Sequence, residues 1–226
     1  MKKIIAVILA LASMLVLFSC DQNPKPEEDT RTDLQKVTDY YAASCPTKCE
    51  VNYTYDLSGK TATGKSTLVT GKIAGKIATV YTYEFEKMAS ISDDATSAVT
   101  KETGSKEYLE DKGVRTNASG KWAKDGTNFA PTLGSIAINL DATIIKEYTY
   151  ENNTLTFVVA ADDTATILGE ENAVNADVTV TIVDDGAVVT GITLDYTLPK
   201  TSRVDKTHVT YVTVYSYDLQ TVELLK

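Results

Sequence analysis

The sequence of 226 residues contains a single histidine, His208, and three cysteines, Cys20, Cys45 and Cys49. A site built from several histidines is therefore excluded, and a Ser-His-Asp arrangement is possible only around His208. Basic residues are also scarce: 22 lysines and arginines face 31 aspartates and glutamates, and the formal net charge is −9. Because nucleic-acid-binding proteins need a basic surface, this balance argues against nucleic acid as a partner.

Sequence motifs for catalysis and cation binding are missing as well. No Gly-x-Ser-x-Gly elbow and no D-x-[DN]-x-[DN]-G calcium loop occurs. Paired carboxylates are frequent, but each pair lies at a predicted turn or helix start, where acidic residues serve structural roles. The pairs are Asp93-Asp94, Asp162-Asp163, Glu170-Glu171 and Asp184-Asp185. We therefore expect no enzyme activity, no metal site and no cofactor.

Residues 59–66, Gly-Lys-Thr-Ala-Thr-Gly-Lys-Ser, match the phosphate-loop pattern G-x-x-x-x-G-K-[ST] letter for letter. That motif needs a buried strand before it and a helix after it, because a helix N-terminus helps to hold the phosphates. Here the preceding segment alternates between apolar and polar residues, and residues 67–71 favour a strand. We expect a glycine-rich β-turn and no nucleotide binding.

The N-terminus has the features of a secretory signal peptide. Lys2 and Lys3 precede residues 4–18, an apolar run in which only Ser13 is polar. The run is shorter than the about 20 apolar residues of a comfortable membrane span. The segment that follows, residues 20–31, contains Pro24, Pro26 and several acids, with almost no apolar side chain. Such a composition predicts a flexible, acidic tether.

Leu17-Phe18-Ser19-Cys20 resembles the lipobox of bacterial lipoproteins, although Phe18 departs from the usual small or β-branched residue. The resemblance implies cleavage before Cys20 and attachment of acyl chains such as palmitate to its sulfur. More than one chain is needed for stable anchoring. Residues 1–19 are then the lipoprotein signal peptide, residues 20–31 the tether, and residues 32–226 a single β-rich domain. We expect a location in the bacterial cell envelope, anchored by lipid on the periplasmic or cell-surface side of a membrane.

Cys45 and Cys49 are separated by three residues in an exported chain, in a compartment that permits disulfides. Pro46 prevents a continuous helix between them, so the chain can turn back and bring the sulfurs together. A redox pair or half of a metal site is the alternative, but no second cysteine pair is present and the spacing is not C-x-x-C. We predict a structural disulfide.

Hydrophobic periodicity predicts one N-terminal helix, residues 32–44, and then mainly strands. Leu34, Val37 and Tyr41 fall on one face of that helix. A helical stretch after Pro131, through residue 144, and one or two turns over residues 162–168, capped by Asp162 or Asp163, are also expected. Residues 88–104 are a loop or a short helix. Strands are predicted at residues 50–57, 66–70, 76–85, 106–111, 114–117, 146–150, 155–160, 177–183, 187–198 and 209–217. Hairpin turns are expected at Lys112-Gly113, at Asn152-Asn153 and at Asp184-Asp185-Gly186.

The order of these elements resembles the half-barrel superfamily of the lipoprotein carriers LolA and LolB and of LppX. Residues 106–122, 146–169 and 177–217 bear the resemblance. It implies a mainly β (α+β) fold: a curved antiparallel sheet, with a few short helices on its concave side and room for acyl chains between them. No family-specific ligand motif can be matched, so the ligand-binding residues are unknown.

Thirteen tyrosines against four phenylalanines suit a surface that is apolar along the ring and polar at its tip. The same tyrosines also fit ordinary cross-strand pairs. Our leading hypothesis is a membrane-anchored lipoprotein that binds or carries a lipid or acyl chain in a cavity. The alternative is a non-catalytic surface or periplasmic module, without a cavity, that binds protein or polysaccharide. An apolar hollow of roughly 300 Å³ or more between the sheet and the helices would favour the carrier, whereas a solid core would favour the alternative.

Overall fold

The computed structural model describes residues 29–57, 60–88, 99–131, 138–201 and 206–225. The chain divides into two compact units, Met1–Thr32 and Asp33–Lys226. Within the described part of the first unit, an ion pair of 2.8 Å joins Arg31 and Asp29. All that follows concerns the second unit.

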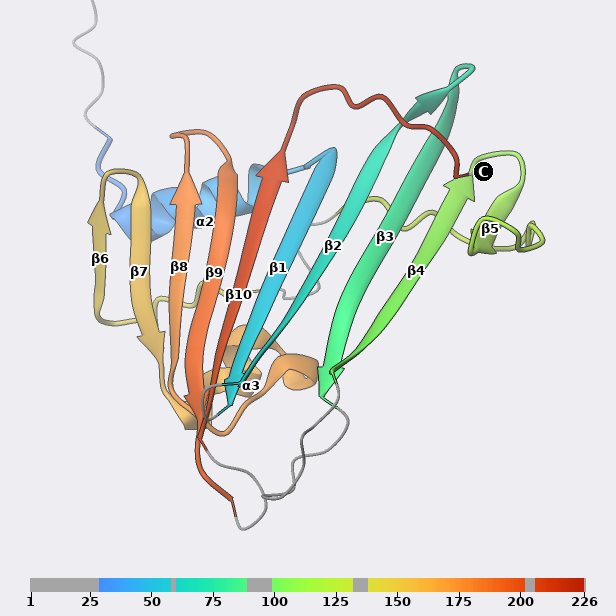
Figure 1. Ribbon diagram of the computed structural model, residues 1–226. Helices are drawn as coiled ribbons and strands as arrows, with labels where there is room; N and C mark the ends of the chain where they lie inside the picture. Colours follow the sequence, from blue (N-terminus) through green and yellow to red (C-terminus); the bar gives the residue numbers. More distant parts are fainter. Residues whose placement is uncertain (1–28, 58–59, 89–98, 132–137, 202–205, 226) are drawn as a thin grey trace, which may run out of the picture. The chain divides into compact units, whose positions relative to one another are not determined.

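The second unit is built on one ten-stranded antiparallel sheet in the order β5-β4-β3-β2-β1-β10-β9-β8-β7-β6 (Figure 1). Its helical segments are α2 (Asp33–Ala43), η1 (Ala161–Asp163), α3 (Thr164–Leu168) and η2 (Glu170–Asn172). The strands are β1 (Lys48–Leu57), β2 (Lys60–Ile73), β3 (Lys76–Met88), β4 (Val99–Leu109), β5 (Gly113–Thr116), β6 (Tyr148–Glu151), β7 (Thr154–Val159), β8 (Val178–Asp184), β9 (Val189–Leu198) and β10 (Thr207–Ser216). The expected fold class, a mostly β protein with a curved, unclosed antiparallel sheet, is confirmed.

Two meanders form this sheet. Strands β1–β5 run outward one after another, and β6–β10 return until β10 pairs with β1 in a ten-residue register from Lys48 opposite Ser216 to Leu57 opposite Thr207. Each outer edge is a strand of four residues, β5 at one end and β6 at the other. Short edge strands limit pairing with other chains.

Tight turns join the strands where the sequence predicts them. Asn152 and Asn153 both have positive φ between β6 and β7, as a type I′ hairpin turn requires. Gly186, with φ of 88°, lies between β8 and β9. Gly113 begins β5 directly after the turn from β4, so the hairpin around Lys112-Gly113 is confirmed as well.

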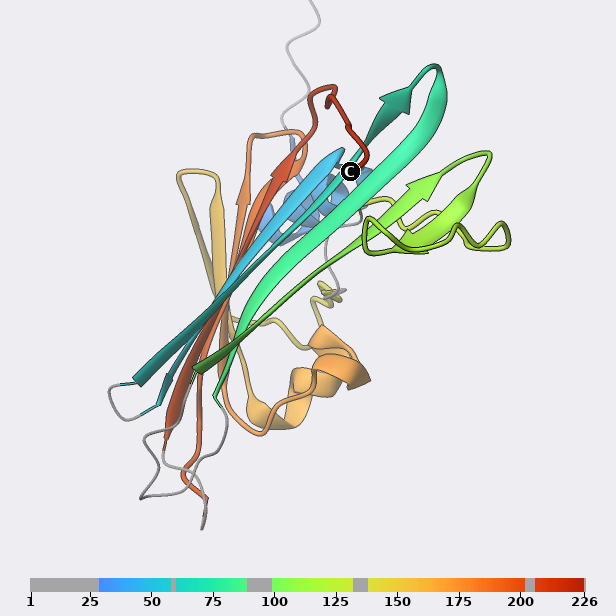
Figure 2. The same cartoon turned by 45° about the vertical axis from the view of Figure 1, so that its right-hand side comes forward.

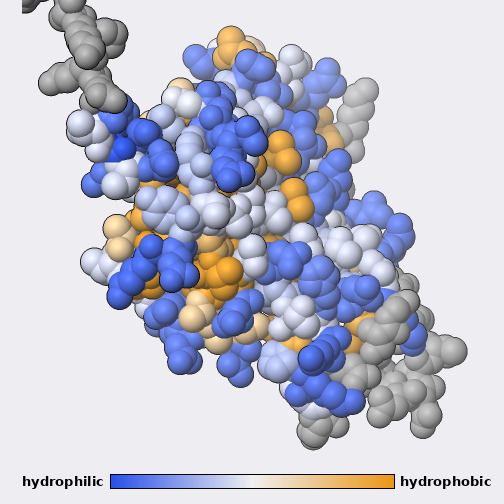
Figure 3. Space-filling model, turned by 90° about the vertical axis from the view of Figure 1, so that its left-hand side faces the viewer, coloured by the Kyte–Doolittle hydropathy of each residue, from blue (hydrophilic) through white to orange (hydrophobic). Residues whose placement is uncertain are grey.

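Both α2 and α3 cover the same face of the sheet, which we call the inner face (Figure 2). Leu34 and Val37 from α2 and Ile167 from α3 are buried against the inward side chains of β7–β10, such as Val180. The α2 prediction is thereby confirmed. Figure 3, seen from the β6 edge, shows one larger hydrophobic patch framed by hydrophilic residues, with smaller hydrophobic spots elsewhere on this side.

The C-terminal tail covers part of the opposite face, which we call the outer face. It leaves β10 and crosses toward β4 (Figure 1), with Gln220 bridged to Gly71. Val222 is buried against Ala78 and Leu109. At its end, Leu225 contacts a fully buried glutamate of β4, Glu107, through a hydrogen bond of 2.7 Å from its backbone N–H to Oε1.

Several sequence predictions need correction. The helical stretch expected between Pro131 and residue 144 is wrong for its described part, because residues 138–147 form an irregular segment with one turn. Ile138 and Ile145 are nevertheless buried, so the apolar spacing reflects contacts with the core. Neither Asp162 nor Asp163 caps α3 through its side chain. Residues 99–104 belong to β4, while residues 58–59 and 89–98 lie outside the described residues.

Candidate functional site

A small pocket lies between the inner face of the sheet and the segment that contains α3 and η2. Its volume is about 250 Å³. Gly169, with φ of 82°, separates α3 from η2, and the whole segment joins β7 to β8. The lining residues are Leu168, Glu171, Asn172, Ala173, Val174, Leu194, Tyr196 and Tyr211. The walls are thus mainly apolar, with two polar side chains from η2.

Aromatic rings continue from this pocket across the inner face. Tyr211 on β10 lies 5.9 Å from Tyr53 on β1 between ring centroids, and Tyr53 lies 5.4 Å from Phe85 on β3. Phe85 stacks on Tyr83 at 4.9 Å, and Tyr55 contacts both Tyr53 and Tyr211. We call Tyr53, Tyr55, Tyr81, Tyr83, Phe85, Tyr196 and Tyr211 the aromatic strip. All seven side chains are half-buried.

Glycines make room for two rings of this strip. A Cβ atom on Gly64 of β2 would lie 1.9 Å from Tyr53 Cε1, and one on Gly104 of β4 would lie 2.4 Å from the Tyr83 hydroxyl. Gly64 occupies an inward position between Tyr53 and Phe85 in the register, and Gly104 lies opposite Tyr83. The rings therefore lie flat against the backbone of the next strand.

Burial raises the pKa values of two tyrosines of the aromatic strip, Tyr196 and Tyr211. Burial raises the pKa of Tyr196 to about 12. It also raises the pKa of Tyr211, to which a hydrogen bond of 2.7 Å with the Tyr55 hydroxyl adds. Tyr196 and Tyr211 therefore stay uncharged well above neutral pH and present ring surface together with hydroxyl groups.

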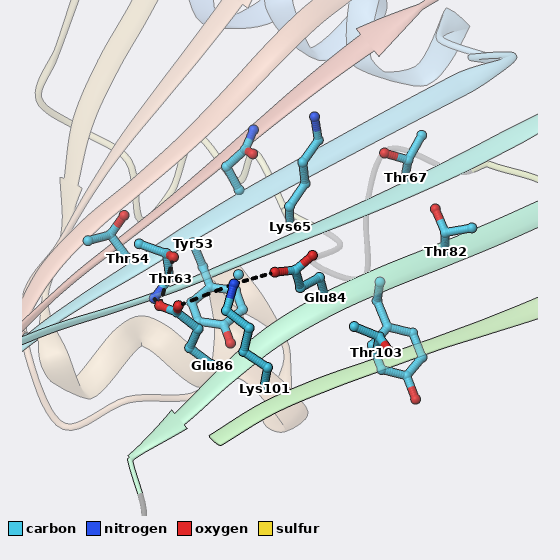
Figure 4. A pocket seen from close by; sticks show the side chains of 13 residues that line it. Tyr53, Thr54, Thr63, Lys65, Thr67, Thr82, Glu84, Glu86, Lys101 and Thr103 are labelled. Carbon is cyan, nitrogen blue, oxygen red and sulfur yellow. Dashed lines mark hydrogen bonds and ion pairs between the residues drawn. The ribbon is translucent and has the colours of Figure 1, made fainter. Parts of the chain in front are cut away.

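A second hollow lies on the outer face, over β1–β4 (Figure 4). We call it the outer groove; its volume is about 750 Å³. Lys101 Nζ lies 2.8 Å from Glu84 and 3.9 Å from Glu86, and Glu86 accepts hydrogen bonds of 3.0 Å from the backbone N–H and the hydroxyl of Thr63. These bonds from Thr63 lower the pKa of Glu86, and Lys101 lowers it further. Most side chains that line the outer groove carry a charged, hydroxyl or amide group.

His208 lies on the outer face, in an exposed position. Its Nε2 is 3.0 Å from Asp195 Oδ2, and the Thr210 hydroxyl donates to the same carboxylate at 3.2 Å. In a catalytic triad the hydroxyl nucleophile binds the imidazole, which the carboxylate orients from its other side. Here the carboxylate stands between the two, so the three groups do not form a triad.

The predicted Cys45–Cys49 disulfide is not present, since both cysteines are free. Cys45 is exposed, whereas Cys49 is an inward residue of β1 with an exposed fraction of 6%. Pairing with Tyr215 and Leu68 on the neighbouring strands holds the backbone of Cys49 within the sheet, so this residue cannot turn back toward Cys45. Burial raises the pKa of the Cys49 thiol to about 11.

The remaining sequence candidates fall outside these sites. Cys20, the predicted lipidation site, lies outside the described residues. Residues 60–66 of the phosphate-loop pattern form part of β2, so the expected glycine-rich β-turn is wrong for these residues, and no helix follows them directly. Within the described ranges, no group of three or more His, Cys, Asp or Glu side chains is placed to hold a metal ion. No helix in the same ranges is long and apolar enough to cross a membrane.

The sequence predicts that tyrosines line an apolar surface with polar tips, but it does not predict which tyrosines form the aromatic strip. Alternation places Tyr53 and Tyr55 on one side of their strand, and it does the same for Tyr211. The pairing of β1 with β10 brings these two sets together, and no local pattern reports that pairing. Gly64 and Gly104 were a usable signal, because a glycine inside a strand often marks a close approach.

No protein-family model matches the chain, and no curated protein sequence matches it. Among solved structures, the chain is similar to the crystal structure of a DUF1329 family protein from Desulfovibrio piger. The two share 9% sequence identity, the match covers 84% of this chain and 93% of that chain, and the TM-score is 0.26. A likeness of this size carries no argument about function.

Proposed function

We propose that the protein is a bacterial cell-envelope lipoprotein, anchored through Cys20, that binds a hydrophobic or amphipathic ligand on the inner face of its sheet. The observation that carries this proposal is the continuity of the pocket with the aromatic strip through Tyr196 and Tyr211. Membership of the half-barrel superfamily that the sequence resembles is part of the same proposal. The proposal also includes that the protein is not an enzyme, because its single histidine, His208, lies on the outer face and not at the ligand site.

The ligand is held in two parts. The pocket of about 250 Å³ is smaller than the hollow of roughly 300 Å³ expected for a carrier, which is also the lower bound of most small-molecule sites. It therefore takes only one end of an acyl chain or similar group. The rest lies along the aromatic strip, whose rings offer apolar surface. Tyrosine hydroxyls and the side chains of Glu171 and Asn172 meet the polar part of the ligand.

A pair of bulky substitutions tests this proposal. Val174→Trp fills the pocket, while Val158→Trp adds the same bulk to the outer face, where Val158 has an exposed fraction of 63%. A dansyl-labelled fatty acid is titrated into each full-chain variant and its fluorescence is followed. We expect Val174→Trp to weaken binding about tenfold or more and Val158→Trp to leave it unchanged. Absence of binding to the unsubstituted protein, or equal loss in both variants, contradicts the proposal.

Anchoring is tested separately. Cys20→Ser removes the sulfur that would carry the acyl chains, so the protein is expected to leave the membrane fraction of the expressing cells. Recovery of Cys20→Ser in that fraction at the level of the unsubstituted chain contradicts the anchor and leaves the ligand site untouched.

A further inference from the structure

The outer groove is a second, chemically different site. Its side chains stand in rows. Two rows cross four strands, Asn52, Lys65, Glu84 and Thr103 in one and Thr54, Thr63, Glu86 and Lys101 in the next, and a shorter row on β2 and β3 holds Thr67 and Thr82. Neighbouring strands are about 4.8 Å apart and successive outward residues about 6.7 Å apart. The groove thus presents a lattice of polar groups at a spacing comparable with the size of one sugar ring (Figure 4).

Charges within the outer groove compensate one another. Its lining includes two lysines and two glutamates. Lys101 is bound between Glu84 and Glu86, and Lys65 lies 3.7 Å from Glu50 at the rim. A groove without net charge does not attract a polyanion such as a nucleic acid or an acidic polysaccharide. The matching ligand is therefore neutral.

Hydroxyl groups make up most of the remaining lining. Within the described part of the chain, no side chain or backbone group hydrogen-bonds to the hydroxyls of Thr54, Thr67, Thr82 or Thr103. An acyl chain in this place would remove these hydroxyls from water without replacing their hydrogen bonds, which is costly. A ligand that itself carries many hydroxyls forms new hydrogen bonds to these threonines in place of the bonds to water.

We propose that the outer groove binds a neutral polysaccharide. Threonine is also a common strand residue, so the hydroxyls alone do not identify the site. The volume of about 750 Å³, the compensated charges and the unbonded hydroxyls together select a neutral, hydroxyl-rich chain. The site is independent of the inner face, and neither proposal requires the other.

Affinity electrophoresis of the full chain tests this inference, in a detergent without sugar groups. The gels contain dextran, mannan or hydroxyethylcellulose as neutral probes and polygalacturonate as an anionic probe. We expect at least one neutral polymer to retard the protein and polygalacturonate not to do so. The double variant T67V/T82V keeps shape and strand propensity but removes two hydroxyls, and its dissociation constant should rise about tenfold.

The matched control is T181V/T193V, which removes a facing pair of outward threonines on β8 and β9, outside the outer groove. Its retardation should equal that of the unsubstituted protein. Three results overturn the inference: no retardation by any neutral polymer, stronger retardation by polygalacturonate, or equal loss in both double variants. The fatty-acid titration of the inner face serves as an unaffected readout, so failure here is distinguishable from failure of the ligand proposal.

Discussion

The ring of Tyr53 on β1 lies directly over Gly64 on β2, in the space that a side chain at position 64 would need. A methyl group there would come within 1.9 Å of Tyr53 Cε1, so the ring would have to move. Gly64→Ala should destabilise the domain by about 1–3 kcal/mol, the usual cost of overpacking. Urea denaturation followed by tyrosine fluorescence measures the free energy of unfolding.

Whether Gly64→Ala destabilises or stabilises the domain should depend on the ring of Tyr53. With Tyr53→Ala in place, the same Gly64→Ala change meets no obstacle and restricts a flexible glycine inside a strand. It should then stabilise the domain by about 0.5–1 kcal/mol. An equal loss in both backgrounds would show that the ring does not occupy the position above Gly64.

The turns of the sheet and helix α2 could be predicted from the sequence, because each of them depends on residues that are close together in the chain. The turns at Asn152-Asn153 and at Gly186 follow from residues that tolerate positive φ. Helix α2 follows from the spacing of Leu34 and Val37. Each of these signals lies within a few residues of the structure that it predicts.

The candidate sites were not predictable in the same way. The Tyr55–Tyr211 hydrogen bond joins residues 156 positions apart, and it depends on β10 returning to pair with β1. Alternation of apolar and polar residues shows on which side of its strand each tyrosine lies. It does not show which residue of another strand lies next to that tyrosine. The predicted helix after Pro131 is wrong for a related reason: Ile138 and Ile145 enter the core from an irregular segment.

Glu107 and Arg115 hold the C-terminal tail against the outer face. Glu107 has an exposed fraction of 0%, and Arg115 binds its carboxylate and the carbonyl of Leu225. Arg115→Met leaves a buried charge without its partner, so we expect a loss of about 3–5 kcal/mol in the free energy of unfolding. Lys101→Met breaks an ion pair at the surface and should cost far less. Equal losses in the two variants would contradict the role of Glu107.

Alkaline pH should weaken the fold through its buried phenols. The pKa values of Tyr150 and Tyr196 are raised to about 12, in both cases mainly by burial. In the unfolded chain these phenols ionise near pH 10, so their contribution to stability is complete below pH 10 and is lost as the pH rises toward 12. Urea denaturation across this range measures the loss. Tyr196→Phe should show a smaller decrease than the unsubstituted protein, and an identical decrease would contradict the assignment.

Thiol reactivity distinguishes the structure from the disulfide that the sequence predicts. In a mature chain carrying Cys20→Ser, Cys45 is exposed and should react with a thiol reagent at once. Cys49 is buried and its pKa is raised to about 11, so it should react only after unfolding. Adding Cys45→Ser should abolish the fast phase and keep the slow one. If neither thiol reacts in the unfolded chain until a reductant is added, a disulfide joins them and the conformation of residues 45–49 described above is wrong.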